Sequence, residues 1–351
     1  MEGDGGPSGL QAEFVMAGSR TAADVAAELS RFIGAAERSL DVAIYDFEAK
    51  DGASAAVGEA LELAAGRGVA VRVAFNQERQ HRPSAPRPPK CDPAVIDGLD
   101  VPTRGVHGDG TLMHHKYVVR DGASVWTGSM NWTDDAFGLE ENVLLRLDSP
   151  EIATAYANDF RQLWDGGTVE RSGLEGPEVS LAGGVTVRPT FSPRGPSLAH
   201  LCASVLGTAR HRIRVLSPVI TSGVVLGTLA EFAARESFDL VGAYDLTQME
   251  EVRRQWQVVP PNHWKLEAWK VIAPRLSGKH STPYAPGSVH DYMHAKAIMA
   301  DDEVVTGSYN LSRHGTFNAE NVLHIRNAPV AQRFARFAEQ VAVRYASPTT
   351  R

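Results

Sequence analysis

The sequence predicts an α/β protein made of two similar halves, and three observations support this prediction. The same order of strand-like and helix-like segments occurs twice along the 351 residues. A polar sequence motif recurs as well: "MHHKYVVRDGASVWTGSMN" begins at Met113, and "MHAKAIMADDEVVTGSYN" begins at Met293. Strands that alternate with helices favour a mixed sheet flanked by helices. We therefore expect two mixed α/β sheets related by a pseudo-two-fold axis.

Periodicity defines the elements of the first half. Apolar residues at a spacing of three and four indicate helices, whereas short runs rich in apolar and β-branched residues indicate strands. The expected elements are a helix at 25–36, a strand at 40–47, a helix at 61–65, a strand at 69–76 and a helix at 152–163. The last helix follows "DSP", which is a helix start signal with proline near the first turn.

The second half repeats this order. Its expected elements are a helix at 198–205, a strand at 213–220, a helix at 226–236, a strand at 238–244 and a helix at 330–341. The intervening segment is "DGGTVERSGLEGPEVSLAGG", whose six glycines predict a linker. We therefore divide the chain into a disordered tail at 1–10, a first half at 11–165, a linker at 166–184 and a second half at 185–346.

The composition excludes several classes of protein. With 43% hydrophobic and 22% charged residues, the chain has enough apolar material for packed cores. A formal net charge of -7 argues against binding a polyanion through a global basic field, so any such partner must be met by a local cleft. We expect no secretory signal and no membrane span, because no suitable apolar run occurs. Two cysteines make neither a disulfide framework nor a metal site, and Cys202 lies on an apolar helix face, where a structural role is expected. Without a secretory signal or a disulfide framework, cytoplasm is the expected compartment.

The repeated motif places ionisable side chains close together in the sequence. Alternation along a strand puts His114 and Lys116 on one face, while His115 points to the other and is expected to be structural. An imidazole beside an ammonium group suits the handling of a phosphate. A hairpin turn at Asp121 then brings Ser129 back beside this pair.

The two copies contain the same set of polar residues. Glu141 follows Asn131 at the same spacing at which Glu320 follows Asn310, and an asparagine comes after each glutamate. We aligned the copies on this spacing. The first copy contributes His114, Lys116, Asp121, Ser129, Asn131 and Glu141, and the second contributes His294, Lys296, Asp301, Ser308, Asn310 and Glu320.

Two His-x-Lys-x4-Asp motifs, each followed by Gly-Ser-x-Asn, resemble the phospholipase D superfamily of lipases, nucleases, transferases and phosphatidyl synthases. The resemblance covers most of residues 11–346. It implies two phospholipase D-like halves around one active site, in which one motif histidine attacks phosphorus and the other acts as general acid. We expect His114 to form the phosphohistidine and His294 to protonate the leaving oxygen, although near-symmetry of the motifs leaves the reverse order open. The resemblance also implies that Asp121 and Asp301 are structural.

The residue types support the same chemistry. Imidazole is able to attack or to donate a proton near neutral pH. The two lysines suit the non-bridging phosphate oxygens, helped by the serines and asparagines of the motifs. Glu141 and Glu320 suit the histidine Nδ1 protons. No further cluster with metal-ligand spacing occurs, so we expect a phosphodiesterase without a metal or other cofactor, and a monomer is able to complete the site.

Substrate choice is expected from loops that differ between the halves. Residues 79–104 carry five Lys or Arg against three Asp, and residues 249–280 combine tryptophans with basic groups. Basic and aromatic residues together suit a nucleic-acid strand and also a membrane interface. We favour a nuclease-like activity, with a phospholipase or phosphatidyl-transferase as the alternative and a non-catalytic DNA- or phosphate-binding module as a third possibility. The expected substrate-binding residues are Arg253, Arg254, Trp264, Lys265, Trp269 and Lys270.

Overall fold

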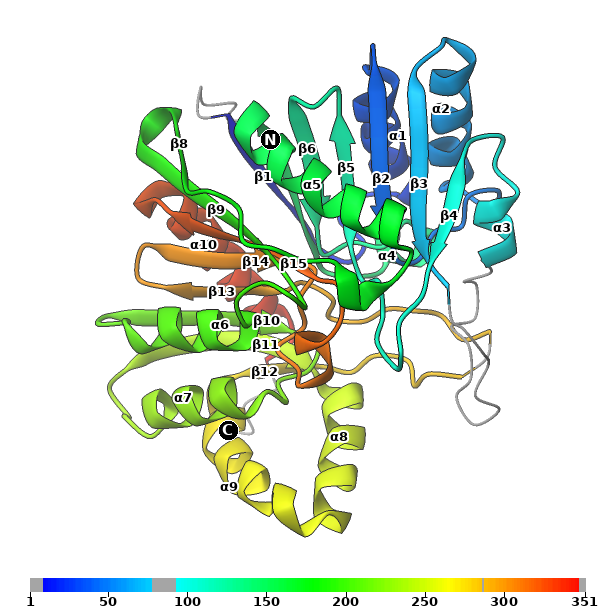
Figure 1. Cartoon of the computed structure of the whole chain (residues 1–351). Helices are drawn as coiled ribbons and strands as arrows, with labels where there is room; N and C mark the ends of the chain where they lie inside the picture. Colours follow the sequence, from blue (N-terminus) through cyan, green and yellow to red (C-terminus); the bar gives the residue numbers. More distant parts are fainter. Residues whose placement is uncertain (1–8, 78–92, 286, 347–351) are drawn as a thin grey trace.

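The computed structural model describes residues 9–77, 93–285 and 287–346, and these residues form two mixed sheets with helices on their faces (Figure 1). The first sheet has the strand order β1-β7-β6-β5-β2-β3-β4. Its strands are β1 Leu10–Val15, β2 Ser39–Ile44, β3 Ala70–Asn76, β4 Thr103–Val106, β5 Lys116–Arg120, β6 Ser124–Gly128 and β7 Asn142–Asp148. The helices of this half are α1 Ala22–Gly34, α2 Ala55–Gly66, α3 Pro93–Asp97, α4 Asp134–Gly138 and α5 Pro150–Gly166.

The second sheet has the order β12-β11-β10-β13-β14-β15-β9-β8. Its strands are β8 Val179–Leu181, β9 Val185–Phe191, β10 Arg212–Ser217, β11 Asp239–Asp245, β12 Ser277–Lys279, β13 Ala297–Ala300, β14 Glu303–Gly307 and β15 Asn321–Arg326. The α-helices are α6 Leu198–Gly207, α7 Gly223–Ala233, α8 Leu246–Val258, α9 His263–Ile272 and α10 Ala328–Arg344. Short 3-10 helices are η1 Val169–Arg171, η2 Ala182–Gly184, η3 Pro260–Asn262, η4 Ala273–Arg275 and η5 His314–Thr316.

The two sheets are copies of one plan. When β1 is matched with β9, β2 with β10 and β7 with β15, both sheets follow the same spatial order, and in both the three strands at one edge pair in parallel. The predicted α/β fold with two similar halves is confirmed. The segment at 166–184, which we expected to be a linker, contains η1, β8 and η2, and β8 extends the second sheet beyond β9.

Local capping explains the matching helices α5 and α10. Ser149 caps α5 by accepting a hydrogen bond from the Ile152 N–H, and Asn327 caps α10 in the same way through the Val330 N–H. A proline occupies the first turn of each helix, where its missing N–H costs nothing. These signals start both helices directly after β7 and β15, so the equivalent elements begin at equivalent places.

In the part of the chain that the structure describes, three apolar cores hold the molecule together. One core lies under α1 and α2 on the outer face of the first sheet, and a second lies under α6, α7 and α9 on the outer face of the second sheet. The third combines residues of both sheets with α5 and α10, including Tyr117, Tyr156, Phe191 and Phe334. Because both halves contribute side chains to this shared core, its packing fixes the position of one half relative to the other. No helix within the described ranges has the length and apolar character needed to cross a membrane.

Candidate active site

Both copies of the repeated motif line one cavity of about 200 Å³ between the halves. His114 and Asn131 come from the first half, and His294 and Asn310 come from the second. The other lining residues are Tyr45, Asp46, Glu140, Pro218, Gln248, Tyr284, His290 and Tyr292. The structure thus brings the two motifs together, as the duplicated sequence predicts.

Each motif reaches the cavity because its strand segment pairs briefly with the opposite half. Met113 forms an isolated bridge with Ala319, and Met293 forms one with Glu141. Consistent with this, the His114 N–H donates to the Ala319 carbonyl at 2.9 Å. The two histidines therefore follow backbone positions that are anchored across the interface.

The glycine of each Gly-Ser-x-Asn sequence allows the return strand to turn toward the cavity. Gly128 and Gly307 have φ angles of 150° and 157°, a region that favours glycine. A Cβ at Gly128 would lie 2.1 Å from the Val143 carbonyl oxygen, and one at Gly307 would lie 2.2 Å from that of Asn321. Any side chain at these positions would push the hairpin away from its neighbouring strand.

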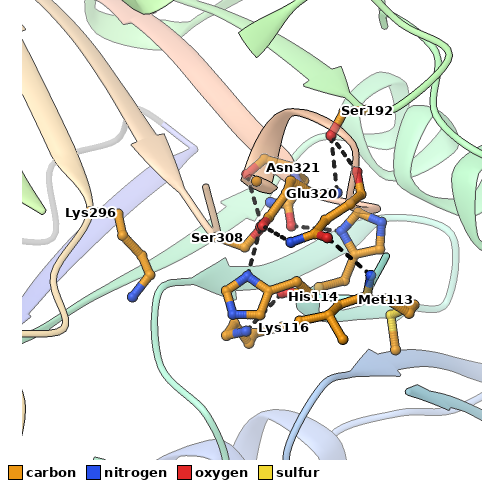
Figure 2. A network of polar contacts seen from close by, with 12 residues as sticks. Met113, His114, Lys116, Ser192, Lys296, Ser308, Glu320 and Asn321 are labelled. Atoms are coloured by element: carbon orange, nitrogen blue, oxygen red, sulfur yellow. Dashed lines mark hydrogen bonds and ion pairs between the residues drawn. The ribbon is translucent and has the colours of Figure 1, made fainter. Parts of the chain in front are cut away.

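His114 forms a compact pair with Glu320 of the other half. Its Nδ1 lies 2.8 Å from Glu320 Oε2, which also accepts a hydrogen bond of 2.6 Å from the Ser308 hydroxyl (Figure 2). Burial raises the pKa of Glu320, but His114, Lys116 and Ser308 lower it more, so the carboxyl is ionised. Burial lowers the pKa of His114 to about 4, with Glu320 opposing this change. At neutral pH the ring therefore donates its Nδ1 proton to Glu320 and keeps a free electron pair on Nε2.

The two motif lysines occupy equivalent buried positions. Lys116 Nζ donates to the His114 carbonyl at 2.7 Å, and Lys296 Nζ donates to the His294 carbonyl at 2.6 Å. Burial lowers the pKa of Lys296 well below its usual range, and the nearby Lys116 lowers it further. Two cations that repel each other in a buried cleft would be stabilised by a bound phosphate anion.

At His294, an asparagine takes the place that Glu320 has at His114. Its Nδ1 lies 3.2 Å from Asn142 Oδ1 and 3.2 Å from Glu140 Oε2. The expectation that Glu141 accepts a histidine proton is wrong. Glu141 instead accepts hydrogen bonds from Lys279 Nζ at 2.8 Å and from the Tyr345 hydroxyl at 2.5 Å.

A register difference of one residue causes this exchange. The Ser129 N–H bonds to the carbonyl of Val143, fourteen positions later, whereas the Ser308 N–H bonds to that of Asn321, thirteen positions later. Our alignment of Glu141 with Glu320 is therefore displaced by one residue in space. A slip of one residue turns each side chain to the opposite face of a strand, so Asn142 takes the place that Glu320 has in the second half.

The motif serines support the site from behind instead of facing a substrate. The Ser129 hydroxyl donates to Asn142 Oδ1 at 2.7 Å, as the Ser308 hydroxyl does to Glu320. Both serines are fully buried and each hydroxyl proton is already donated to a neighbouring side chain, so their expected donation to phosphate oxygens is wrong. Asn131 and Asn310 do line the cavity, and their Oδ1 atoms accept no hydrogen bond within the described residues.

The two motif aspartates lie in hairpin turns. Asp121 and Asp301 have positive φ angles of 57° and 51°. The Asp121 carboxylate accepts hydrogen bonds from the backbone N–H groups of residues 37–39, and the Asp301 carboxylate accepts those of residues 210–212. Each aspartate thus ties its turn to the segment that enters the central strand, which is the geometry of a structural support.

His115 is fully buried in the shared core. Its Nδ1 lies 3.1 Å from Asn321 Oδ1, and its Nε2 lies 3.1 Å from Asp159 Oδ2. Both contacts are to structural residues outside the cavity. This placement agrees with the structural role expected for His115.

The proposed stacking and phosphate-binding residues of α8 and α9 are mostly engaged elsewhere. Trp269 is 3% exposed and packs edge to face on Tyr244, so the prediction that it stacks on a base is wrong. Lys265 is buried and donates to the Thr221 carbonyl. Arg253 is exposed, as are Arg254, Trp264 and Lys270, but Arg254 and Lys270 form surface ion pairs on their own helices. Of the other basic loop, residues 79–92 lie outside the described residues.

Part of the cavity wall comes from residues outside the two repeated motifs, and the sequence did not predict it. Tyr284, His290 and Tyr292 come from the segment that precedes the second motif, and Tyr45 follows β2. Glu140 was missed because the second copy has no carboxyl at the corresponding place, which the register difference assigns to Asn318. Its one sequence signal is the doubled glutamate "EEN", where the second copy has "AEN".

A family model described as "Cardiolipin synthase, PLD-like domain" matches residues 29–164 and 203–342. The mitochondrial cardiolipin hydrolase of Xenopus laevis is 32% identical over 130 residues, which are 37% of this chain and 56% of that protein. That of Chlamydomonas reinhardtii is 30% identical over 142 residues, or 39% and 57% of the two chains.

A solved structure extends the likeness to the whole fold. Phosphatidylserine synthase of Haemophilus influenzae superposes with a TM-score of 0.63 at 14% identity, covering 95% of this chain and 86% of that one. At this identity the likeness concerns the fold alone. Because it covers 95% of this chain, the likeness includes both sheets.

Proposed function

Because this chain belongs to the phospholipase D superfamily and contains its PLD-like domain twice, we propose that it hydrolyses phospholipids through a phosphohistidine on His114. The pairing of His114 with an ionised glutamate carries the assignment of the nucleophile. Glu320 takes the Nδ1 proton, which leaves Nε2 unprotonated and directed to phosphorus. His294 has no ionised glutamate in that place and serves as the general acid.

The reaction then follows from the positions of these groups. His114 Nε2 forms a bond to phosphorus while the bond to the leaving oxygen breaks, and His294 gives that oxygen a proton. Lys116 and Lys296, with the amides of Asn131 and Asn310, stabilise the charge that develops on the non-bridging oxygens. A water molecule next gives a proton to His294 and attacks phosphorus, which releases His114. We propose that the two lysines make a metal ion unnecessary.

Exposed apolar side chains on the segments that contribute to the cavity or flank it in sequence favour a lipid substrate. Leu139 and Val289 are 41% and 45% exposed and directly precede the cavity residues Glu140 and His290. Tyr284 is 41% exposed and lines the cavity itself. Phe317 is 55% exposed and corresponds in position to Leu139. Phe317 lies two residues before Ala319, which forms the bridge to Met113, and Leu139 lies two residues before Glu141, which forms the bridge to Met293. We call these four side chains the apolar rim.

The apolar rim supports a membrane interface more than a nucleic-acid cleft. Large apolar side chains that remain exposed near a site mark contact with a lipid or protein surface. A nucleic-acid strand instead needs several free cations along its path. The cardiolipin hydrolases named above act on a phospholipid by their name, and this is a second support for the lipid proposal.

The proposal is tested by offering the purified protein several substrates in parallel. We expect release of headgroup from vesicles of cardiolipin and phosphatidylglycerol, in the presence of EDTA, and none from His114→Ala. Leu139→Asp with Phe317→Asp should lower the vesicle rate strongly, because a charge at the rim opposes insertion, while a soluble chromogenic phosphodiester is affected much less. Equal losses on both substrates would contradict a membrane role for the rim.

Nucleic acid is the second candidate, and exposed basic residues on α8 favour it. Gln248 in the first turn of this helix lines the cavity, and Arg253 and Arg254 further along the helix are exposed. Single-stranded DNA and RNA therefore belong in the same assay. Cleavage of either at rates far above vesicle hydrolysis, with a flatter salt dependence after Arg253→Ala and Arg254→Ala, would establish the nuclease in place of the lipase.

A further inference from the structure

Glu140 is a buried carboxyl group in the cavity with no equivalent in the second half. It is 2% exposed and lines the same cavity as both catalytic histidines. Its Oε2 lies 3.2 Å from His294 Nδ1 and 3.2 Å from the Asn142 side-chain nitrogen. The adjacent Asn142 amide holds this carboxyl in place, because its nitrogen also donates to the Ala136 carbonyl at 3.2 Å.

The two histidines thus differ in what faces Nδ1. His114 faces an ionised glutamate, which only accepts a proton. His294 faces an amide oxygen and the carboxyl of Glu140. The amide oxygen already accepts a hydrogen bond from Ser129. Of the two groups at His294 Nδ1, only a carboxyl is able to supply a proton.

We propose that Glu140 stores the proton with which His294 acts as general acid. In the resting site the neutral carboxyl shares its proton from Oε2 with Nδ1, so that Nε2 carries the proton for the leaving oxygen. Glu140 is in this sense a positioning residue that acts through His294. The inference rests on the function proposed above and specifies the acid half of its mechanism.

The charges around the pair favour the neutral form. Burial raises the pKa of Glu140 to about 8, although Lys296, Asn142 and Lys279 lower it and Asp46 raises it again. Burial also lowers the pKa of His294 well below its usual range, as do Lys296, Lys116, His114 and His290. The groups that face the pair are Lys116, Lys296, Lys279, Asp46, His114 and His290. A neutral carboxyl beside a neutral imidazole is the arrangement that burial stabilises.

The proton balance closes over both steps. When His114 Nε2 bonds to phosphorus and the P–O bond breaks, the leaving oxygen takes the Nε2 proton of His294. The shared proton then moves from Glu140 to His294 Nδ1, which leaves a neutral imidazole and a carboxylate. In the second step water gives a proton to Nε2, the new P–O bond forms, the P–N bond breaks, and the Nδ1 proton returns to Glu140. A coupled pair of this kind titrates as one unit.

Glu140→Gln and the matched control Glu141→Gln test the inference. The control removes the neighbouring, fully buried carboxyl, which lies outside the cavity and faces Lys279. Rates are measured from pH 5 to 10, below the melting temperature of each variant, on two soluble phosphodiesters: one with a p-nitrophenolate leaving group and one with an alkoxide. The alkoxide depends on an acid, whereas nitrophenolate leaves with little help.

The expected results separate acid storage from a structural role. The wild-type rate on the alkyl diester should fall as pH rises through about 8, where Glu140 loses its proton. Glu140→Gln should lower this rate by about 100-fold or more, abolish the alkaline limb, and affect the nitrophenyl diester much less. Glu141→Gln should keep the limb and the wild-type ratio of the two rates. A limb and a ratio in Glu140→Gln equal to those of the wild type would overturn the inference.

A measurement on the resting protein keeps this test independent of activity. Infrared difference spectra at pH 7 between the wild type and Glu140→Gln should show the loss of one protonated carboxyl. No such loss would refute proton storage even if the enzyme proved inactive on every diester offered. Conversely, an absence of wild-type phosphodiesterase activity with the carboxyl band present would count against the proposed function alone.

Discussion

The buried pair of Glu141 and Lys279 should be the strongest polar brace between the two halves. Glu141 is fully buried in the first half, and Lys279, 6% exposed, lies at the end of β12 in the second. Their Oε2 and Nζ atoms are 2.8 Å apart. Tyr345, just after α10, donates its hydroxyl to the other Glu141 oxygen. The pair therefore ties the first motif region to an edge of the second sheet and to the end of the last helix.

We expect Lys279→Met and Glu141→Gln to destabilise the protein by about 3–5 kcal/mol each, because each leaves a buried charged or polar partner without compensation. At about 2 °C per kcal/mol for a chain of this size, the melting temperature should fall by roughly 6–10 °C. The double variant should cost less than the sum of the single variants by about 2 kcal/mol, since neither buried charge remains.

The measurement is a double-mutant cycle in urea, followed by tryptophan fluorescence, with melting temperatures as a second readout. A matched surface control is Lys270→Met, whose partner Glu267 is exposed; it should cost less than about 1 kcal/mol. If the two buried single variants cost no more than this control, or if their costs simply add, the brace does not exist in solution.

Three further outcomes follow from the site. Glu320→Gln should lower turnover of a soluble diester by about 100-fold or more with little change in melting temperature, because Gln cannot stabilise the charge on His114. His114→Ala and His294→Ala should each lower turnover by several orders of magnitude, and the double variant should be about as slow as either, because the residues act as one unit. Asp121→Ala should cost about 1–3 kcal/mol of stability through lost backbone hydrogen bonds, with turnover retained. Burial raises the pKa of Asp121, but those hydrogen bonds lower it more. The stability that Asp121 contributes is therefore fully present above the ordinary carboxyl pKa and is lost as the pH falls through the lowered value. Melting temperatures measured against pH for the wild type and Asp121→Ala would show this loss.

The duplicated plan and the composition of the motif were predictable because they depend on local information. Helical and strand periodicity is a property of short segments, and the spacing of His114, Lys116 and Asp121 survives in the second copy. Burial along a strand also follows from alternation, which placed His115 opposite His114. These features need no knowledge of how distant segments meet.

The predictions that Trp269 and Lys265 bind substrate failed for the opposite reason. Trp269 and Lys265 stand in a sequence rich in basic and aromatic residues, and this composition suits a binding surface as well as a helix that covers a core. Burial of Trp269 against Tyr244 depends on how α9 packs on the second sheet. Composition carries no information on that packing.

The sequence by itself therefore determined the two halves, the paired His and Lys groups and the phosphodiester chemistry that they permit. Only the tertiary structure decided which carboxyl serves which histidine. His114 and Glu320 are separated by 206 positions, and Glu141, identical in its local letters to Glu320, is turned away to Lys279 by one extra residue in its loop. A strand reverses its faces with each residue, so a single insertion exchanges the acid at the site, and no local pattern records on which side of the strand it falls.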